Sequence, residues 1–309
     1  MFAEEWRDER DYVIAHTSGS TGTPKPIRLK KSDMELSARA TADFFHIDAG
    51  SLLALPLAEE YIAGKMMVVR AILTGAELIE EPPSRTPLAR KLPRRVDLAA
   101  IVPQQIKGLT ESPCEIRNVI VGGAPVSPAL EQYALDARPD IRWWGTYGMT
   151  ETCSHVALRA FGTDLFEALP AVSFSTDERG CLVIKHEKAS WSPLTTNDMV
   201  DLYTPTSFRW LGRYDNVIIS GGLKIHPEEV ERMLSRSVSG IRFYVTGRPS
   251  EAWGQESVLV VEGEPSAETE RRFREAFAAL PSFKRPKEII YKDAFCFTKS
   301  GKIKRDGVV

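Results

Sequence analysis

One nine-residue segment near the N-terminus concentrates groups that can hold phosphate. Residues 17–25 read TSGSTGTPK, and the candidate ligand contacts are Thr17, Ser18, Gly19, Ser20, Thr21, Gly22 and Lys25. Glycine allows the backbone to approach an anion closely, while amide and hydroxyl groups donate hydrogen bonds to its oxygens. The Walker A pattern does not fit, because Pro24 stands where its second glycine belongs and Pro26 follows the lysine. The segment predicts a polyphosphate loop of another type, with a solvated polar connection as the alternative.

Four further clusters follow this loop in a fixed order along the chain. They are YGMTET at 147–152, TTND at 195–198, GRYD at 212–215 with SGGLK at 220–224, and SGKI at 300–303. With residues 17–25 they resemble the successive signatures of the acyl-adenylate-forming (AMP-binding) superfamily, in particular its acyl-CoA synthetases. Each motif alone is weak to moderate evidence, but five in order make the resemblance specific, and it covers almost the whole chain.

The resemblance implies an ATP-dependent acid–CoA ligase. In this reaction a carboxylate attacks the α-phosphate of ATP and gives acyl-AMP and pyrophosphate, and the thiol of coenzyme A then displaces AMP. No protein nucleophile is needed, so such an enzyme positions anions and neutralises developing charge. A small carboxylic acid, ATP, Mg²⁺ and coenzyme A are therefore the implied substrates and cofactor.

The resemblance also assigns the nucleotide-binding residues. Residues 17–25 would hold the β- and γ-phosphates. Thr150 and Glu151 would face the phosphates, with Glu151 as the carboxylate ligand of Mg²⁺. Tyr147 would stack on adenine beside Gly123 and Ala124, although an aromatic residue at a sheet end can also pack into the core.

The remaining catalytic roles fall in the second half of the chain. By resemblance, Asp198 would accept hydrogen bonds from the ribose hydroxyls, and Arg213 would hold the ribose or a phosphate. Lys302 would bridge the attacking carboxylate and the α-phosphate, where a charged donor strengthens as the transition state forms. Asp215 would be the hinge about which a C-terminal lid rotates between the two half-reactions.

That rotation would bring a glycine-containing segment to the thiol in the second half-reaction. Gly221, Gly222 and Lys224 are the residues assigned to this step by resemblance. Lys224 can equally belong to the end of a strand without a chemical role. The charged tail around Lys302 would be a solvated terminus if the motif were accidental.

Residues near the acyl site indicate one acid in particular. Many acyl-CoA synthetases carry a histidine after the Leu-Pro segment at 55–56, and here Tyr61 comes closest. The compact chain resembles the o-succinylbenzoate–CoA ligases of menaquinone biosynthesis, whose substrate has a second carboxylate that needs a cation. Lys65, within an apolar helical segment, could supply it, or could reach solvent from the helix edge. His155 and Arg159 are other candidates, and Gly145 is included in the expected acyl pocket.

The elements that position these residues follow from the apolar pattern. Strands are expected at 12–15, 52–57, 77–79, 118–121 and 141–144, with helices at 62–73, 128–137 and after a capping box formed by Ser32 and Glu35. Alternating strands and helices predict an α/β fold with mostly parallel sheets and flanking helices, and ligands at the carboxyl ends of the strands. Residues 1–214 form the expected AMP-binding domain, shortened at its N-terminus, because only sixteen residues precede the phosphate loop.

The last part of the chain is expected to fold as a small α+β lid domain, residues 215–309, which moves relative to the larger domain. Pro227 begins a predicted helix, strands are predicted at 241–246 and 258–261, and a second helix covers 267–279.

Composition limits the other functions. The chain has 309 residues with 40 basic and 42 acidic side chains, which gives no basic surface that predicts nucleic-acid or membrane binding. The four cysteines form no C-x-x-C pair, and the N-terminal residues do not resemble a signal peptide. We therefore expect a cytoplasmic enzyme, and the sequence leaves a homodimer open.

Two alternatives remain at this stage. One is a CoA ligase for another aryl or acyl acid. The other, from a different class, is a nucleotide-binding pseudoenzyme or regulatory subunit. The presence of Lys302, Glu151, Asp198 and Arg213 argues against the second, because an inactive copy has no reason to keep all four residue types.

Overall fold

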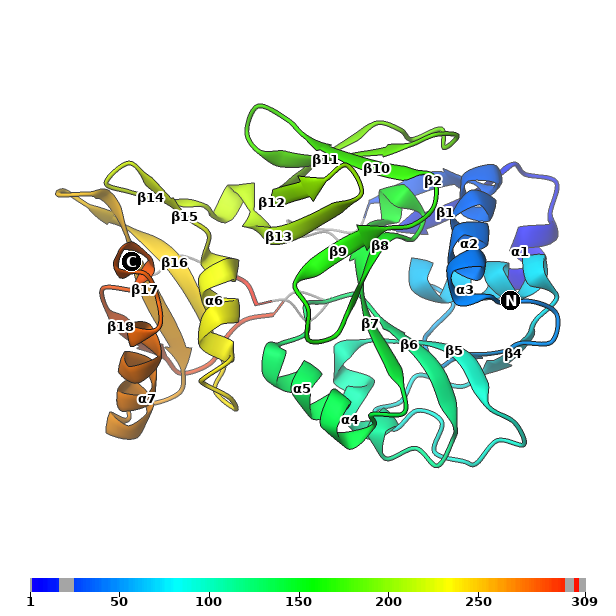
Figure 1. The fold of residues 1–309 in the computed structure, drawn as a ribbon, viewed down its shortest axis with the longest axis horizontal. Helices are drawn as coiled ribbons and strands as arrows, with labels where there is room; N and C mark the ends of the chain where they lie inside the picture. The colour runs from blue at the N-terminus through cyan, green and yellow to red at the C-terminus, as the bar shows by residue number, and fades with distance from the viewer. Residues whose placement is uncertain (1, 17–24, 298–302, 306–309) are drawn as a thin grey trace.

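The structure is a computed structural model, and it describes residues 2–16, 25–297 and 303–305. Its helices are α1 (Phe2–Arg7), α2 (Lys31–Phe45), α3 (Ile62–Thr74), α4 (Ile106–Thr110), α5 (Pro128–Ala137), α6 (Pro227–Ser235) and α7 (Ala267–Ala278). Within these described ranges no helix is long and apolar enough to cross a membrane. A larger unit and a smaller C-terminal unit, coloured yellow to red, lie side by side in Figure 1.

The larger unit is organised around one sheet of eleven strands. They are β3 (Leu52–Leu55), β4 (Glu77–Glu80), β5 (Val96–Ile101), β6 (Ile116–Val121), β7 (Arg142–Gly148), β8 (His155–Ala160), β9 (Leu165–Ala168), β10 (Val172–Thr176), β11 (Cys181–His186), β12 (Leu194–Thr204) and β13 (Ser207–Arg213). The strand order is β10-β11-β12-β13-β9-β8-β7-β6-β5-β3-β4. The α/β class predicted from the sequence is confirmed.

The parallel arrangement is restricted to one half of this sheet. Strands β4, β3, β5, β6 and β7 are parallel neighbours, and each pair beyond β7 is antiparallel. The helices α3, α4 and α5 connect parallel strands, whereas short turns join most of the antiparallel ones. Short connections between neighbouring strands impose antiparallel pairing, because a parallel pair needs a long crossover.

Strand β3, inside the parallel half of the sheet, is buried on both faces, which explains its unbroken apolar sequence. In β3, Leu53 and Leu55 belong to the core under α2 and α3, whereas Leu52 and Ala54 belong to the core under α4 and α5. Alternate side chains point to opposite faces of a strand, so two helical layers require apolar residues at every position. Strand β5, which the sequence analysis did not predict, has the same character.

Two helix ends were predicted from capping residues in the sequence, and the structure confirms one of them. Helix α3 ends at Gly75, whose φ of 73° is left-handed, as predicted. The predicted capping box of Ser32 and Glu35 is wrong. The N-cap of α2 is Lys30, without a side-chain cap, because the helix begins directly after a strand at Lys31.

That strand belongs to a small separate sheet. β1 (Tyr12–His16) pairs with β2 (Pro26–Lys30) in antiparallel register, with His16 opposite Pro26. Buried Phe2 and Trp6 of α1 join the same apolar core as α2 and α3. The strand predicted at 12–15 is therefore present, but it lies outside the parallel sheet.

The C-terminal unit has its own sheet and core. Its strands are β14 (Ile218–Ser220), β15 (Leu223–Ile225), β16 (Phe243–Ser250), β17 (Gly254–Glu262) and β18 (Ile289–Lys292). Val230 of α6 and Phe273 of α7 are fully buried against this sheet. In Figure 1, α6 lies on the side of the unit that faces the larger one. The expected domain boundary at 214/215 falls in the short 3₁₀ turn Tyr214–Asn216 between them.

Candidate active site

Two glycines shape the turn that follows β6. A side chain at Gly122 would place its Cβ only 2.6 Å from Oγ1 of Thr146 on the neighbouring strand β7, and Gly123 has a φ of 83°. Both positions therefore favour glycine. Gly123 is exposed and Ala124 half-buried, and the turn lies against Thr146, the residue before Tyr147.

Tyr147, near the end of β7, is tied to Asp198 of β12. Its hydroxyl donates a hydrogen bond of 2.7 Å to Oδ2 of Asp198, and its ring packs edge-on against Phe208. Burial, together with the charge of Asp198, raises the pKa of Tyr147 well above its usual value, so the phenol stays protonated as the donor. The ring is thus part of an aromatic core while its polar end faces the expected ribose site.

Asp198 and Arg213 lie opposite each other on paired strands β12 and β13. Nη1 of Arg213 lies 3.7 Å from Oδ1 of Asp198, and Nη2 lies 3.2 Å from Oδ2 of Asp215. The structure therefore brings together three residues that the sequence placed in two separate motifs. A carboxylate accepts several hydrogen bonds, so Asp198 keeps capacity for ribose hydroxyls beside Tyr147 and Arg213.

Thr150 and Glu151 lie in a 3₁₀ turn directly after β7. Thr152 fixes the turn, because its hydroxyl donates 2.7 Å to the carbonyl of Ser154 and accepts 3.0 Å from the amide of Met149. Thr150 is buried and Glu151 half-buried. The turn holds both residues at the carboxyl edge of the sheet, next to Tyr147.

Glu151 offers one carboxylate to a metal at this edge of the sheet. Among the described residues no group of three or more His, Cys, Asp or Glu side chains could hold a metal. Mg²⁺ in nucleotide sites is typically bound through one or two carboxylates plus phosphate oxygens and water. Glu151 as a single carboxylate fits that pattern.

Several expected site residues lie outside the described residues. These are Thr17, Ser18, Gly19, Ser20, Thr21 and Gly22 of the phosphate loop, and Lys302 near the C-terminus. The flanks of the phosphate loop are described. The pairing of His16 with Pro26 makes residues 17–25 the connection between two antiparallel strands, and Lys25 is exposed.

The residues expected to act on the thiol lie in the C-terminal unit. Gly221 and Gly222 form the turn between β14 and β15, with φ of 56° and 81°. A Cβ at Gly221 would lie 2.7 Å from the indole ring of Trp253, so the turn requires glycine there. Lys224 follows on β15 and is exposed, and no described contact assigns it a role.

Lys65 has a protein partner in this structure. Its Nζ lies 2.9 Å from Oε2 of Glu5 and 4.1 Å from the centre of the Phe2 ring, both on α1. The buried lysine predicted from the sequence is therefore neutralised locally. Tyr61, at the start of α3, is 69% exposed. These contacts give neither residue a described link to the nucleotide-facing residues.

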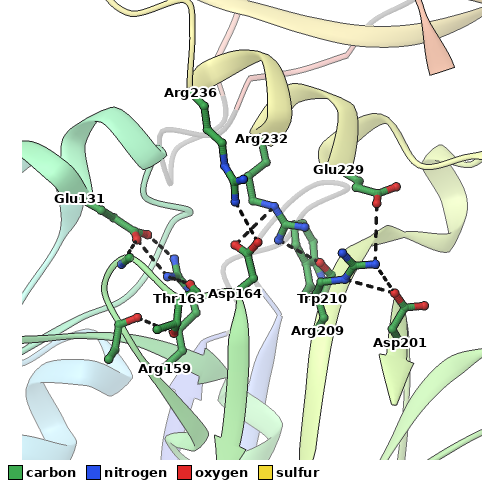
Figure 2. Close-up of polar contacts among 12 residues, drawn as sticks. Glu131, Arg159, Thr163, Asp164, Asp201, Arg209, Trp210, Glu229, Arg232 and Arg236 are labelled. Atoms are coloured by element: carbon green, nitrogen blue, oxygen red, sulfur yellow. Dashed lines mark hydrogen bonds and ion pairs between the residues drawn. The ribbon is translucent and has the colours of Figure 1, made fainter. Parts of the chain in front are cut away.

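Arg159 is also occupied, as Figure 2 shows. Its guanidinium forms a two-point ion pair with Glu131 of α5, with one Nη1–Oε2 distance of 3.0 Å, and donates 2.8 Å to the carbonyl of Thr163. A Cβ at Gly145 would lie 3.3 Å from Nε of Arg159. Gly145 therefore gives room to this arginine side chain across β7 and β8.

A buried hydrogen-bond chain runs from Arg70 to His155. Nη2 of Arg70 lies 2.6 Å from Oγ of Ser154, that Oγ lies 3.3 Å from Nδ1 of His155, and Nε2 of His155 lies 3.2 Å from Oγ1 of Thr41. Thr41 donates its single proton to the carbonyl of Ser37, at 3.1 Å. It must therefore accept from Nε2, which assigns the Nε2–H tautomer, with Nδ1 accepting from Ser154.

Arg70 is a buried cation that pairs with no carboxylate of residues 2–16, 25–297 or 303–305. It is 1% exposed, and among the described residues its Nη groups contact only Ser154 and the sulfur of Met67, while Nε has no partner. Burial lowers the pKa of Arg70 to about 9, which still leaves it charged at neutral pH. Burial and the charge of Arg70 lower the pKa of His155 well below its usual value, so the imidazole is neutral. Buried charges are normally paired, so this site favours an anion.

The sequence analysis overlooked Arg70, although a signal was available. Arg70 interrupts the same apolar helix as Lys65, five residues further along. Five residues on an α-helix turn the side chain to a different face. Lys65 consequently faces α1, whereas Arg70 faces the segment that carries Thr150 and Ser154. Lys65 was one of three candidate cations for a second carboxylate, and in the structure it is paired with Glu5, whereas Arg70 has no carboxylate partner among the described residues.

Contacts between α6 and the larger unit hold the two units together. Asp164, between β8 and β9, lies 3.0 Å from Nη2 of Arg236 and 3.8 Å from Nε of Arg232. Arg232 also donates 3.2 Å to the carbonyl of Trp210 (Figure 2). Arg209 of β13, which is paired with Asp201, lies 3.9 Å from Glu229 of α6. These described ion pairs between the two units involve exposed and half-exposed side chains together with the buried Glu229.

Comparison with known proteins identifies the class. Residues 2–179 match the AMP-binding enzyme family, which is more than half of the chain, and the chain belongs to this family. The resemblance inferred from the five motifs is confirmed. The expected enzyme class, an acid–thiol ligase, is confirmed with it, because the curated relatives reported below are acid–CoA ligases.

Particular relatives give a closer view. The 2-succinylbenzoate–CoA ligase of Enterococcus faecalis is 27% identical over 94% of this chain and 67% of its own length. The indoleacetate–CoA ligase of Aromatoleum aromaticum is 25% identical over 96% of this chain and 66% of its own length. The chain spans about two thirds of the length of these relatives.

Solved structures share the fold. An acyl-CoA synthetase (AMP-forming)/AMP-acid ligase II-like protein from Dyadobacter fermentans is 34% identical, with a TM-score of 0.64 over 98% of this chain and 90% of that one. The o-succinylbenzoate coenzyme A synthetase of Bacillus subtilis in complex with ATP and magnesium ion is 20% identical. Its TM-score is 0.78 over 96% of this chain and 69% of that one.

Proposed function

We propose that this protein is an ATP-dependent acid–CoA ligase whose acid is o-succinylbenzoate. A carboxylate oxygen of the acid attacks the α-phosphorus of ATP, the bond to the β-phosphate oxygen breaks, and pyrophosphate leaves. The sulfur of coenzyme A then attacks the acyl carbon, its proton is lost, and AMP leaves. The products are the acyl-CoA, AMP and pyrophosphate.

One observation carries the nucleotide part of this proposal. Tyr147, Asp198 and Arg213, which come from three strands, converge at one edge of the sheet through the 2.7 Å and 3.7 Å contacts to Asp198. An aromatic face, a carboxylate and a cation suit an adenine, a ribose and a phosphate, in that order. Thr150 and Glu151 follow directly on the chain, where the phosphates would extend.

The remaining assignments rest on the motifs. Residues 17–25 would hold the pyrophosphate group, and Lys302 would bridge the two reacting anions. Bound Mg²⁺, held by Glu151, would shield the phosphates from the incoming carboxylate. Gly221, Gly222 and Lys224 would face the thiol after residues 215–309 have rotated about Asp215 as a lid. We place the enzyme in the cytoplasm and keep a homodimer as part of the proposal to be tested.

The choice of acid rests on Arg70. A substrate with two carboxylates leaves one of them unreacted, and that charge needs a partner away from water. Arg70 is a buried, charged donor with no carboxylate partner in the described part of the chain, and the residue it contacts, Ser154, lies three residues after Glu151. The ligase for 2-succinylbenzoate from Enterococcus faecalis is also among the relatives.

The experiment is a pyrophosphate-release assay with ATP, Mg²⁺ and a panel of acids. The proposal expects the highest kcat/KM for o-succinylbenzoate, and formation of its CoA thioester when coenzyme A is added. Equal turnover of benzoate, indoleacetate or a fatty acid would overturn the assignment of the acid but retain the ligase. Nucleotide binding without pyrophosphate release from any acid would indicate a regulatory protein instead.

A further inference from the structure

The last described residues of the chain are fastened to α6 by one arginine. Nη1 and Nη2 of Arg305 lie 2.7 and 2.8 Å from Oε1 and Oε2 of Glu231, which is a two-point ion pair. Nη1 also donates 2.9 Å to the carbonyl of Val245 on β16, and the amide of Val245 donates 2.7 Å to Oε1 of Glu231. Arg305, Glu231 and Val245 are thus joined by four hydrogen bonds, which connect the C-terminal segment to α6 and to the five-stranded sheet of the C-terminal unit.

The described residues on either side of 298–302 are paired with each other. Ile303 forms an isolated antiparallel bridge with Phe297, and the amide of Lys304 donates 2.8 Å to the carbonyl of Cys296. The chain before residue 298 and the chain after residue 302 are therefore held side by side. Arg305 anchors the second of these two flanks, two residues after Ile303.

The ion pair is largely shielded from solvent, and it forms only when both side chains are charged. The side chains of Arg305 and Glu231 are 22% and 18% exposed. Burial raises the pKa of Glu231 to about 7, and the positive charge of Arg305 opposes that rise. Planar two-point pairing between guanidinium and carboxylate fixes orientation as well as distance, which a lysine cannot reproduce.

We propose that Arg305 and Glu231 are positioning residues for adenylation, because they fix the flank from which Lys302 extends relative to α6. This inference rests on the proposed function and on the role of Lys302 in it. Neither Arg305 nor Glu231 is proposed to touch a reacting atom. The pair acts by fixing the described flank at Ile303 and Lys304 to the rest of the C-terminal unit, and misplacement of a charged donor by about 1 Å costs up to about a hundredfold in rate.

The test separates the two half-reactions in Arg305→Met, Glu231→Gln and Arg305→Lys. Adenylation is measured as pyrophosphate release, and thioester formation is measured from preformed acyl-AMP and coenzyme A. For Arg305→Met and Glu231→Gln we expect kcat for adenylation to fall roughly 10- to 100-fold, with KM for ATP and the thioester step changed less than about twofold. Arg305→Lys should be intermediate, because a lysine restores the charge without the two-point geometry.

A double variant distinguishes positioning from general destabilisation. If Arg305 acts through Lys302, Arg305→Met should reduce adenylation by less than about twofold further in a Lys302→Ala background. Hydrogen exchange at the amide of Lys304 should quicken in Arg305→Met. The matched control is Arg248→Met, which removes an arginine paired with Glu256 and Glu288 on the same sheet and should leave both half-reactions unchanged.

Three results would overturn the inference. They are unchanged adenylation in both single variants, equal loss of both half-reactions together with a lowered Tm, and full additivity with Lys302→Ala. If the wild-type protein releases no pyrophosphate with any acid, the proposed function fails, whatever the variants do. The wild-type activity and the ratio of variant to wild type therefore test the two proposals separately.

Discussion

Tyr147 and Asp198, which are 51 residues apart in the sequence, are joined by a 2.7 Å hydrogen bond from the phenol to Oδ2. The bond links the end of β7, where the parallel half of the sheet stops, to β12 in the antiparallel half. It also holds one oxygen of Asp198 in a fixed direction. The two halves of the large sheet therefore meet at the proposed nucleotide site.

Removing the phenol should disturb the carboxylate more than the aromatic packing. Tyr147→Phe retains the ring against Phe208 but leaves buried Asp198 without one donor, at a cost of about 1–3 kcal/mol in unfolding free energy. We expect KM for ATP to rise roughly tenfold, because the ribose partner is less well oriented. Urea unfolding and steady-state kinetics measure the two effects, and Tyr203→Phe, at an exposed position, is the control. An unchanged KM for ATP would contradict the placement of the ribose at Asp198.

Replacing Arg70 should separate substrate choice from stability. Arg70→Met removes a buried charge that has no carboxylate among the described residues, so the unfolding free energy should stay within about 1 kcal/mol of wild type or increase. The same change should raise KM for o-succinylbenzoate at least about tenfold, since a buried carboxylate would lose its partner. KM for ATP should not change.

The matched control for Arg70 is the other cation of α3. Lys65→Met removes a lysine already paired with Glu5, and we expect it to keep the preference for the dicarboxylate. If Lys65→Met abolished that preference and Arg70→Met did not, the cation suggested by the sequence would be the correct one. Acid panels with both variants decide between the two residues.

The buried neutral imidazole of His155 should make the protein sensitive to mild acid. The folded-state pKa of His155 is well below the unfolded value of 6.5, so below pH 6.5 the unfolded chain takes up a proton that the folded chain does not. Stability contributed by the neutral residue is therefore present above pH 6.5 and is lost as the pH falls. The loss is at most about 1.4 kcal/mol per pH unit.

Urea unfolding between pH 5 and pH 7.5 measures this dependence. In His155→Gln the side chain cannot take up the proton in either the folded or the unfolded state. The slope of unfolding free energy against pH should therefore fall by up to about 1.4 kcal/mol per pH unit, which corresponds to one proton. Equal slopes for wild type and His155→Gln would show that the imidazole is not held neutral.

The charged junction in Figure 2 should control the attachment of the C-terminal unit. Asp164→Asn removes the carboxylate shared by Arg232 and Arg236. The side chains of Asp164 and Arg236 are 37% and 59% exposed and the contact to Arg232 is 3.8 Å long, so the loss should be below about 1 kcal/mol. Limited proteolysis near residues 214–216 should become faster, and added salt should reproduce the effect in wild type. Asp140→Asn, which breaks an ion pair with Arg138 within the larger unit, should leave the cleavage rate unchanged.

Much of the local structure could be predicted from the sequence. Helix α5 has the predicted bounds, and α3 ends at the predicted glycine, because apolar spacing and Gly75 act within a few residues. The antiparallel half of the sheet could not be predicted in this way. Its strand order depends on which distant strands pair, and the separate hairpin of β1 and β2 has the same apolar pattern as a sheet strand.

In the candidate site, too, residue types could be predicted from the sequence, whereas contacts between distant residues could not. The sequence named Tyr147, Asp198 and Arg213 by motif, and the structure added their mutual contacts. The sequence could not show that Lys65 is paired with the carboxylate of Glu5 while Arg70 contacts only the hydroxyl of Ser154 and a sulfur among the described residues. Both cations lie in one apolar helix, and their contacts come from α1 and from the residue before β8.

The sequence by itself determined the family, the order of the motifs and most helices, because these depend on residue type and on spacing along the chain. Only the tertiary structure decided which charges are satisfied and which residues fix the flanks of the lysine motif. Arg305 meets Glu231 across 74 residues, and Tyr147 meets Asp198 across 51. Such contacts depend on strand register and on the packing of helices against sheets, and no local pattern encodes them.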